Sequence, residues 1–251
     1  MKDTLLKTRP ASVKARPLRW GNQVPEIQAA TAHKRLAILR TAAQLFNERG
    51  FYETTLNELA ERLHVTKPTL YYYVNSKNDI LEQILNTAMQ EIDPAIRRAE
   101  QADASGMEKL RMFVSDYVAV LCGDFGKCLV ISGLSPLDED SRQKLLPAFR
   151  RIDLSVRRII SEGIDDGSIA PLVDPKIAGF ALFGALHWMP SWFDASGQFN
   201  SREIADRFFS IFQSGLRTSA APPVRWRPVA KTPVLRPPPA ATPLTKRRLV
   251  G

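Results

Sequence analysis

Three consecutive tyrosines, preceded by a lysine and two threonines, give one short segment the most evident binding chemistry in the chain. The segment reads Thr66-Lys67-Pro68-Thr69-Leu70-Tyr71-Tyr72-Tyr73. A phenol can donate a hydrogen bond to a phosphate, and its ring can pack on a sugar or on a thymine methyl group. On a helix of two turns at most one or two of the tyrosines can be buried. The segment therefore indicates a surface that contacts nucleic acid, rather than an ordinary core with surface tyrosines.

A short helix must present these side chains, and the flanking residues supply its signals. Thr66 can cap a helix over about 67–74, with Pro68 in the first turn where no backbone donor is missed. Upstream, Thr55-Leu56-Asn57-Glu58 is a capping box that opens another short helix, and residues 64–65 form the turn between the two. This layout is typical of a helix-turn-helix, whose second helix lies in the major groove of DNA.

The middle of the chain is predicted to be helical throughout, because its apolar residues recur at helical spacing and do not alternate. One helix is expected over about 32–49, and Ser76 caps another whose pattern changes after Asp93-Pro94. Gly163 and Gly167 are expected to end one of the later helices, and Ser201 is expected to cap the last one. Those helices are expected at about 107–122, 126–134, 139–162, 175–192 and 201–216. The predicted fold class is all-α, with an N-terminal three-helix helix-turn-helix domain and a larger helical domain.

The N-terminal domain is similar to a known family. The matching residues are Phe46-Asn47-Glu48-Arg49-Gly50-Phe51-Tyr52-Glu53-Thr54-Thr55, Leu59-Ala60, Val65-Thr66-Lys67-Pro68-Thr69-Leu70-Tyr71-Tyr72-Tyr73-Val74, Lys77 and Leu81. They resemble the DNA-binding domain of the tetracycline-repressor (TetR) family. His64 stands where that family usually has glycine, so we expect left-handed backbone geometry at His64.

The resemblance implies a ligand-responsive transcriptional regulator, usually a repressor. Such a protein is a homodimer that binds a palindromic operator in double-stranded DNA and is released from it by a small-molecule effector. The resemblance also implies a set of DNA-contacting residues, in which Lys77 at the start of the fourth helix holds a phosphate. The set is Thr55, Thr66, Lys67, Thr69, Tyr71, Tyr72, Tyr73 and Lys77.

The second half of the chain carries apolar helix faces that are typical of a core. In a TetR-like domain such a core often contains the effector cavity. The residues expected to line the cavity are Phe113, Tyr117, Leu121, Phe149, Ile152 and Trp188.

Near the C-terminus, small residues alternate with large aromatic ones, which suits helices that pack closely in a dimer. The expected interface consists of Phe180, Phe183, Gly184, His187, Trp188, Phe208, Phe209 and Phe212.

The end of this segment, Trp188-Met189-Pro190-Ser191-Trp192-Phe193, also resembles a TetR branch that senses coenzyme A thioesters. Arg150, Arg151, Arg157 and Arg158 could pair with coenzyme A phosphates, or they could form a solvated helix face balanced by carboxylates. A free hydrophobic or aromatic acid and a cationic drug are the competing effectors, and the lack of an acidic cavity disfavours the drug.

The formal net charge of +9 is concentrated at the two ends of the chain. Residues 218–251 carry seven basic side chains, no acidic ones and many prolines, and residues 1–30 are also basic. We predict disordered tails at 1–30 and 218–251, a DNA-binding domain at 31–85 and an effector-binding and dimerisation domain at 86–217. The alternative function is a non-specific nucleic-acid binder that acts through these tails.

Other classes of function find little support in the sequence. The histidines His33, His64 and His187 have no metal-ligand spacing with one another or with a cysteine, and we expect no cofactor and no metal. No nucleotide-binding or hydrolase motif is present, so a helical enzyme is disfavoured. Cys122 and Cys128 are read as buried free thiols rather than a redox sensor. Without an apolar stretch of membrane length, we expect a cytoplasmic protein.

Overall fold

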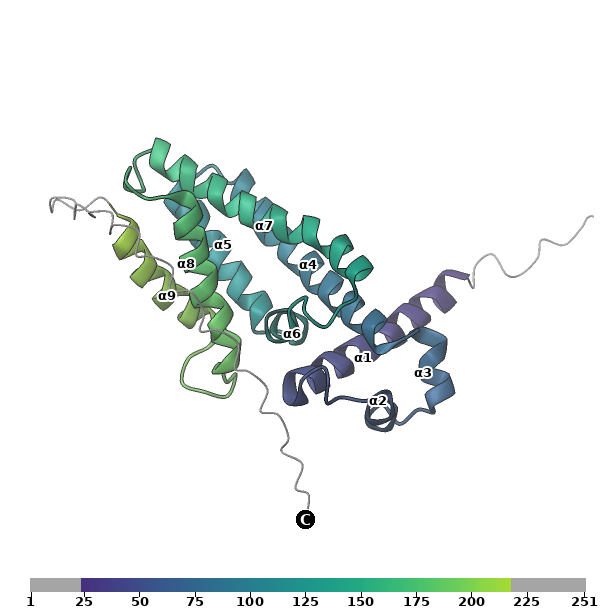
Figure 1. Cartoon of the computed structure of the whole chain (residues 1–251). Helices are drawn as coiled ribbons and strands as arrows, with labels where there is room; N and C mark the ends of the chain where they lie inside the picture. The colour runs from purple at the N-terminus through teal and green to yellow at the C-terminus, as the bar shows by residue number, and fades with distance from the viewer. Residues whose placement is uncertain (1–23, 218–251) are drawn as a thin grey trace, which may run out of the picture. The chain divides into compact units, whose positions relative to one another are not determined.

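The computed structural model describes residues 24–217, with side chains from residue 31 onward, and in this part of the chain all regular secondary structure is helical (Figure 1). It contains nine α-helices and one short 3-10 helix, which confirms the predicted all-α class. The elements are α1 (Val24–Arg49), α2 (Leu56–Arg62), α3 (Lys67–Tyr73), α4 (Lys77–Gln101), α5 (Gly106–Leu121), α6 (Asp124–Ser132), α7 (Glu139–Asp165), α8 (Pro175–Trp188), η1 (Met189–Ser191) and α9 (Ser201–Leu216).

The helix-turn-helix forms where the local signals placed it. Thr55 accepts a hydrogen bond from the backbone N–H of Glu58, whose carboxylate accepts one from the backbone N–H of Thr55, so both halves of the capping box are made. Thr66 accepts from the backbone N–H of Thr69 at the start of α3. His64 has φ of 53°, the left-handed geometry predicted for the turn. Local capping therefore determines the limits of α2 and α3.

The two long helices of this region extend further than the sequence suggested. α1 begins at Val24, so residues 24–30 are helical and the prediction that they belong to a disordered segment is wrong. The remaining parts of the predicted tails, 1–23 and 218–251, lie outside the described residues. α4 continues through Pro94 to Gln101, although a proline removes a backbone donor within a helix. The burial of Ile92, Ala95 and Ile96 on either side of Pro94 outweighs that loss.

Two expected helix ends also differ, for reasons of packing and capping. Of the two glycines expected to end α7, Gly167 follows the C-cap with φ of 77°, as expected, whereas Gly163 lies within the helix. A Cβ added at Gly163 would lie 2.6 Å from Cδ1 of Ile169, and one added at Gly106 would lie 2.2 Å from the backbone nitrogen of Gly163, so packing requires glycine at both positions. The cap of α9 is Asn200 rather than Ser201, because Asn200 and Glu203 form a complete capping box.

α4 joins the helix-turn-helix to the rest of the fold. α4 packs against α1, which belongs to the helix-turn-helix region, and also against α5, α6 and α7 of the second region (Figure 1). Its buried stripe is continuous over its whole length and consists of Ile80, Leu81, Ile84, Leu85, Ala88, Met89, Ile92, Ala95, Ile96 and Ala99. The boundary predicted between 31–85 and 86–217 thus falls inside one unbroken helix.

A second link joins α6 to α1 and is polar. The side-chain amide of Gln44 donates to the carboxylate of Asp124 over 3.1 Å, and that of Asn47 donates to the Asp124 carbonyl over 3.0 Å. Arg40 lies 3.8 Å from the same carboxylate. The first residue of α6 is therefore held against the helix that supports the helix-turn-helix.

Candidate nucleic-acid interface and ligand cavity

α3 presents a polar and aromatic face to solvent because two apolar residues hold its other face. Leu70 and Val74 are buried against the core. Tyr72 is 78% exposed and Tyr71 is 47% exposed, although both carry large apolar rings. The remaining exposed side chains of the segment, all predicted to contact DNA, are Thr66, Lys67 and Thr69. The outward face of α3 thus combines phenols, hydroxyls and one ammonium group.

The third tyrosine differs from its neighbours. Tyr73 is half-buried and packs against the core, with its ring 5.0 Å from that of Tyr72 in an edge-on arrangement. Two of the three tyrosines are therefore exposed, as expected for a helix of two turns. The ring of Tyr73 packs on that of Tyr72, and a DNA contact of Tyr73 stays a prediction.

Thr55 has its hydroxyl occupied within the cap of α2. It accepts from the backbone N–H of Glu58 and donates to the carboxylate of Glu58 over 3.1 Å. The backbone N–H of Thr55, and after it the Thr55 hydroxyl, donate to the Glu58 carboxylate and lower the pKa of Glu58, which keeps the carboxylate charged. The side chain of Thr55 is exposed, so a phosphate contact at this position stays a prediction.

Lys77 makes contacts within the chain that the sequence analysis did not predict. Its ammonium donates to the carbonyls of Phe51, Tyr52 and Thr54 over 2.8, 3.2 and 2.9 Å, and it lies 4.5 Å from the centre of the Phe51 ring. An ammonium has three donors, and all three are used here. In the chain without DNA, Lys77 therefore ties the loop after α1 to the first residue of α4, and a phosphate contact at Lys77 stays a prediction.

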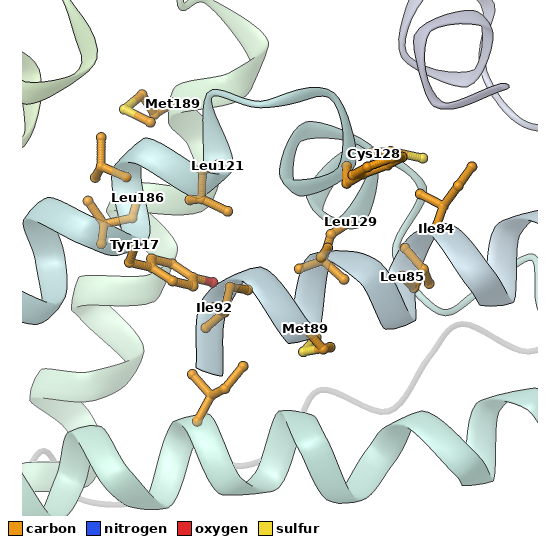
Figure 2. Close-up of a cluster of buried hydrophobic side chains, with 14 of the residues drawn as sticks. Ile84, Leu85, Met89, Ile92, Tyr117, Leu121, Cys128, Leu129, Leu186 and Met189 are labelled. Atoms are coloured by element: carbon orange, nitrogen blue, oxygen red, sulfur yellow. The ribbon is translucent and has the colours of Figure 1, made fainter. Parts of the chain in front are cut away.

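Behind the helix-turn-helix, an apolar cavity of about 450 Å³ lies between α4, α5, α6, α7 and α8. Tyr117, Met89 and Leu129 surround part of it (Figure 2). The lining residues are Met89, Tyr117, Leu129, Val130, Gly133, Phe149, Arg150, Ile152, Asp153, Phe180, Phe183 and His187. Cavities of this size are common binding sites for small molecules.

The sequence identified half of the predicted lining correctly. Tyr117, Phe149 and Ile152 line the cavity. Phe113 and Leu121 are fully buried and do not line it, and Trp188 is 70% exposed on the outside of α8.

Phe113 supports the cavity indirectly, since its ring stacks 5.1 Å from that of Tyr117. Met89 was missed because its helix was expected to change at Pro94, and its only signal is its place one turn after Leu85.

One hydrogen-bonded pair stands in the apolar wall of this cavity. The hydroxyl of Tyr117 lies 2.7 Å from Nε2 of His187, and Tyr117 is only 2% exposed. Burial raises the pKa of Tyr117 and lowers the pKa of His187, because both charged forms are poorly solvated there. At neutral pH the pair is thus an uncharged phenol and an uncharged imidazole.

Of the four arginines of α7 considered for coenzyme A phosphates, three are paired with carboxylates and one is not. Arg151 pairs with Asp93, Arg157 with Asp153 over 2.6 Å and Arg158 with Glu100 over 3.8 Å. These pairs agree with the interpretation of a balanced helix face.

Within the described residues, Arg150 has no carboxylate partner, and it lines the apolar cavity. Arg150 also lines a neighbouring surface groove together with Glu100, Pro147, Arg151, Leu154, Ser155 and Arg158. The cavity therefore meets a basic groove at a single unpaired arginine.

α8 and α9 carry an exposed apolar face in the isolated chain. Phe180, Trp188 and Ile211 are exposed, and Phe183, Phe208 and Phe212 are half-buried. Large exposed apolar surfaces mark sites where another molecule binds. Phe209 was predicted to belong to this face, but it is only 3% exposed and forms part of the chain's own core. The prediction of Phe209 as an interface residue is therefore wrong.

The remaining titratable groups give no sign of catalysis. Burial raises the pKa of both Cys122 and Cys128 to about 11, so they are protonated thiols at neutral pH. Among residues 31–217, no three His, Cys, Asp or Glu side chains are grouped to hold a metal ion. None of the described helices is both long and apolar enough to span a bilayer.

Two family models match consecutive parts of the chain. Residues 38–84 match the model described as "Bacterial regulatory proteins, tetR family". Residues 103–216 match the model "Tetracyclin repressor-like, C-terminal domain". The first match covers the helix-turn-helix, and the second covers the helices from α5 to α9.

Characterised relatives match most of the chain at low identity. The fatty acid metabolism regulator protein of Bacillus subtilis is 22% identical over 185 residues, which is 73% of this chain and 95% of the relative. The transcriptional repressor KstR2 of Mycolicibacterium smegmatis is 22% identical over 204 residues, covering 78% and 96%.

Solved structures share the fold. The TetR family regulator PfmR of Thermus thermophilus has a TM-score of 0.65 at 28% identity, covering 72% of this chain and 99% of PfmR. AibR, solved with isovaleryl coenzyme A and operator DNA, has a TM-score of 0.64 at 24% identity, covering 70% and 96%.

The role found for Lys77 generates a stability prediction. Lys77→Met removes three hydrogen bonds from a charged donor to partly buried carbonyls, so we expect a loss of about 1–3 kcal/mol in the free energy of unfolding. Urea unfolding followed by circular dichroism measures it. Lys67→Met is the matched control, because Lys67 is exposed, and it should change stability by less than about 0.5 kcal/mol. Equal stability of the two variants would contradict the structural role.

Proposed function

We propose that this protein, which belongs to the tetracycline-repressor (TetR) family of bacterial regulatory proteins, is a dimeric repressor whose effector is an acyl-coenzyme A thioester. The family membership gives the chain DNA binding and ligand response, and its relatives are transcriptional regulators rather than enzymes. A regulator that must reach the bacterial chromosome would act in the cytoplasm. The residues that contact DNA, partner and effector are assigned below as part of the proposal.

For DNA, we assign the exposed face of α3. Lys67 would neutralise a phosphate, and the phenols of Tyr71 and Tyr72 would donate to phosphates or pack on sugars. Thr66 and Thr69 lie at the start of the helix, where side chains reach the bases. Because this face has only one lysine, we expect it to make few contacts that distinguish bases. Most of the binding affinity would then come from contacts with the DNA backbone.

For the partner, we assign the exposed apolar face of α8 and α9 to a second copy of the chain. Trp188 supplies the largest exposed apolar side chain, and Gly184 lies in the same stripe one turn earlier without a side chain in the way. A central aromatic residue with small neighbours is the usual anchor of such an interface. A symmetric dimer would present its two α3 helices to two half-sites about one turn of DNA apart.

For the effector, the single observation that carries the assignment is the place of Arg150. It lines both the apolar cavity and the basic groove, and it has no carboxylate partner among the described residues. An acyl-coenzyme A has an apolar chain at one end and phosphates at the other, so it matches both surfaces at once. The B. subtilis relative is named for fatty acid metabolism and AibR binds isovaleryl coenzyme A, which supports the same class.

Tyr71→Ala is expected to weaken binding to an operator selected from random DNA by about tenfold, since each subunit loses one charge-assisted contact. Fluorescence anisotropy at several salt concentrations measures it. Tyr71→Ala leaves the salt dependence unchanged because a phenol releases no counterion, whereas Lys67→Ala lowers the slope. Sedimentation should show both variants as dimers. Unchanged operator affinity of Tyr71→Ala would remove α3 from the DNA interface.

Trp188→Asp places a charge at the centre of the proposed dimer face, so we expect the dimer to weaken by at least about 30-fold. Analytical ultracentrifugation over a range of concentrations measures the change. Leu154→Asp is the control, since Leu154 is an exposed apolar residue of α7 outside this face. An intact Trp188→Asp dimer would show that the subunits meet elsewhere.

A thermal-shift panel tests the effector. A ligand that binds only the folded protein adds about 2.7 kcal/mol of stability at a hundredfold excess over its Kd. We expect octanoyl- or isovaleryl-coenzyme A to raise the melting temperature more than the matching free acids do. Arg150→Gln should weaken binding of the thioester by about tenfold or more, because the charge-assisted hydrogen bond from Arg150 to a phosphate is lost.

Arg142→Gln is the matched control on the same helix, where Arg142 pairs with Glu139 and lines neither surface. If only the free acids raise the melting temperature, the effector is a hydrophobic acid and not a thioester. Equal effects of the two arginine variants would remove Arg150 from the site.

A further inference from the structure

Tyr117, which is buried, and its hydrogen-bond partner His187, which is exposed in the isolated chain, form the polar feature of the cavity that the proposed effector contacts assigned so far do not use. Arg150 and Asp153 lie on α7, and Asp153 is already paired with Arg157. Tyr117 and His187 instead come from α5 and α8 and stand among Phe113 and Phe183, whose rings lie 5.1 and 5.8 Å from that of Tyr117. A hydroxyl in such a wall costs free energy unless it has a partner, which His187 supplies.

This pair leaves hydrogen-bonding capacity that faces the cavity. A phenol has one O–H donor and two lone pairs, and only one bond to Tyr117 is made, over 2.7 Å to Nε2 of His187. When the neutral imidazole carries its proton on Nε2, it donates to the phenol oxygen. The O–H of Tyr117 is then free to donate to a group inside the cavity.

We propose that Tyr117, held in place by His187, donates a hydrogen bond to the carbonyl oxygen of the acyl group and so makes the protein selective for acyl over alkyl ligands. This inference rests on the proposed function, because it concerns the same cavity. In the acyl part of a thioester, the carbonyl is the one polar group that would lie against this apolar wall. A carboxylic acid also has a carbonyl oxygen, and the two sources are separated by the test.

Tyr117 is thus a specificity-determining residue and His187 a positioning residue. A ligand whose carbonyl is replaced by a methylene would leave the Tyr117 hydroxyl without this bond but would keep every apolar and phosphate contact. Selectivity therefore comes from one hydrogen bond in a poorly solvated wall, where such a bond is strengthened by the lack of water.

The experiment compares matched ligands on the full-length dimer by isothermal titration calorimetry. The pairs are octanoyl-coenzyme A with S-octyl-coenzyme A, and isovaleryl-coenzyme A with S-isopentyl-coenzyme A, together with octanoic and isovaleric acids. Each thioether differs from its thioester by the carbonyl alone. We expect the wild type to bind a thioester about three- to tenfold more tightly than its thioether.

Variants then assign the preference to residues. Tyr117→Phe should bind both members of a pair equally, because it keeps the ring stack and loses only the hydroxyl. Tyr52→Phe is the matched control, since Tyr52 is an exposed tyrosine far along the chain from the cavity, and it should keep the preference. His187→Leu should reduce the preference, and His187→Gln should restore part of it, because an amide can donate to the phenol.

Each outcome decides a different point. Equal binding of thioester and thioether by the wild type overturns the inference while the proposed effector class stands, and this arm needs no variant to fold. A preference that survives in Tyr117→Phe also overturns it. A free acid that binds as tightly as the thioester identifies the carboxylic acid as the source of the carbonyl. Binding of no coenzyme A compound at all overturns the proposed effector class itself.

Discussion

The fold depends on one constraint, which is that α4 belongs to both functional regions at once. Its first residue, Lys77, is tied to the carbonyls of Phe51, Tyr52 and Thr54, and Met89 in its middle lines the ligand cavity. An unbroken buried stripe connects the two positions, so α4 has no loop that could absorb a displacement. A close-packed helix moves as a body rather than by local deformation. A change in the shape of the cavity is therefore transmitted to the residues that hold the helix-turn-helix.

The polar contacts of Asp124 form a second connection between the cavity and the helix-turn-helix region. α6 lines the cavity with Leu129 and Val130, and its first residue is bound by Gln44 and Asn47 of α1. Two cavity walls, α4 and α6, are thus attached separately to the helices that carry α3. On the proposed function, a ligand that shifts these walls would bias the position of α3, and DNA bound to α3 would bias the walls in return, because coupling between two binding sites is reciprocal. The physical basis of the response is a pair of rigid attachments rather than a flexible hinge.

The sequence predicted those parts of the structure that local chemistry determines. The capping box at Thr55, the cap at Thr66 and the left-handed His64 depend on residues within a few positions of one another, and all three were confirmed. Pro94 and Gly163 were misjudged because packing decides them: Pro94 is held in a helix by buried neighbours, and Gly163 lies where a Cβ would meet the buried side chain of Ile169. The resemblance to a family placed Lys77 at a helix start but did not specify which oxygens its ammonium would reach. An apolar helix face in the sequence does not reveal which of its residues line a cavity and which are packed in the core. Tyr117 and Phe149 were therefore predicted correctly as lining residues, whereas Phe113 was not.

In the proposed dimer, α8 would connect the effector to the second subunit as α4 connects the cavity to the helix-turn-helix. Phe183 and His187 line the cavity, while Trp188 is exposed on the same helix. A helix of 14 residues with a ligand on one side and a partner on the other would present a different surface to the partner whenever it adjusted to the ligand. The separation of the two α3 helices would then follow from the angle at which the α8 helices of the proposed dimer meet. On this proposal the cavity, the dimer face and the DNA contact are three surfaces of one packed body, and an effector would act by changing which arrangement of that body has the lowest free energy.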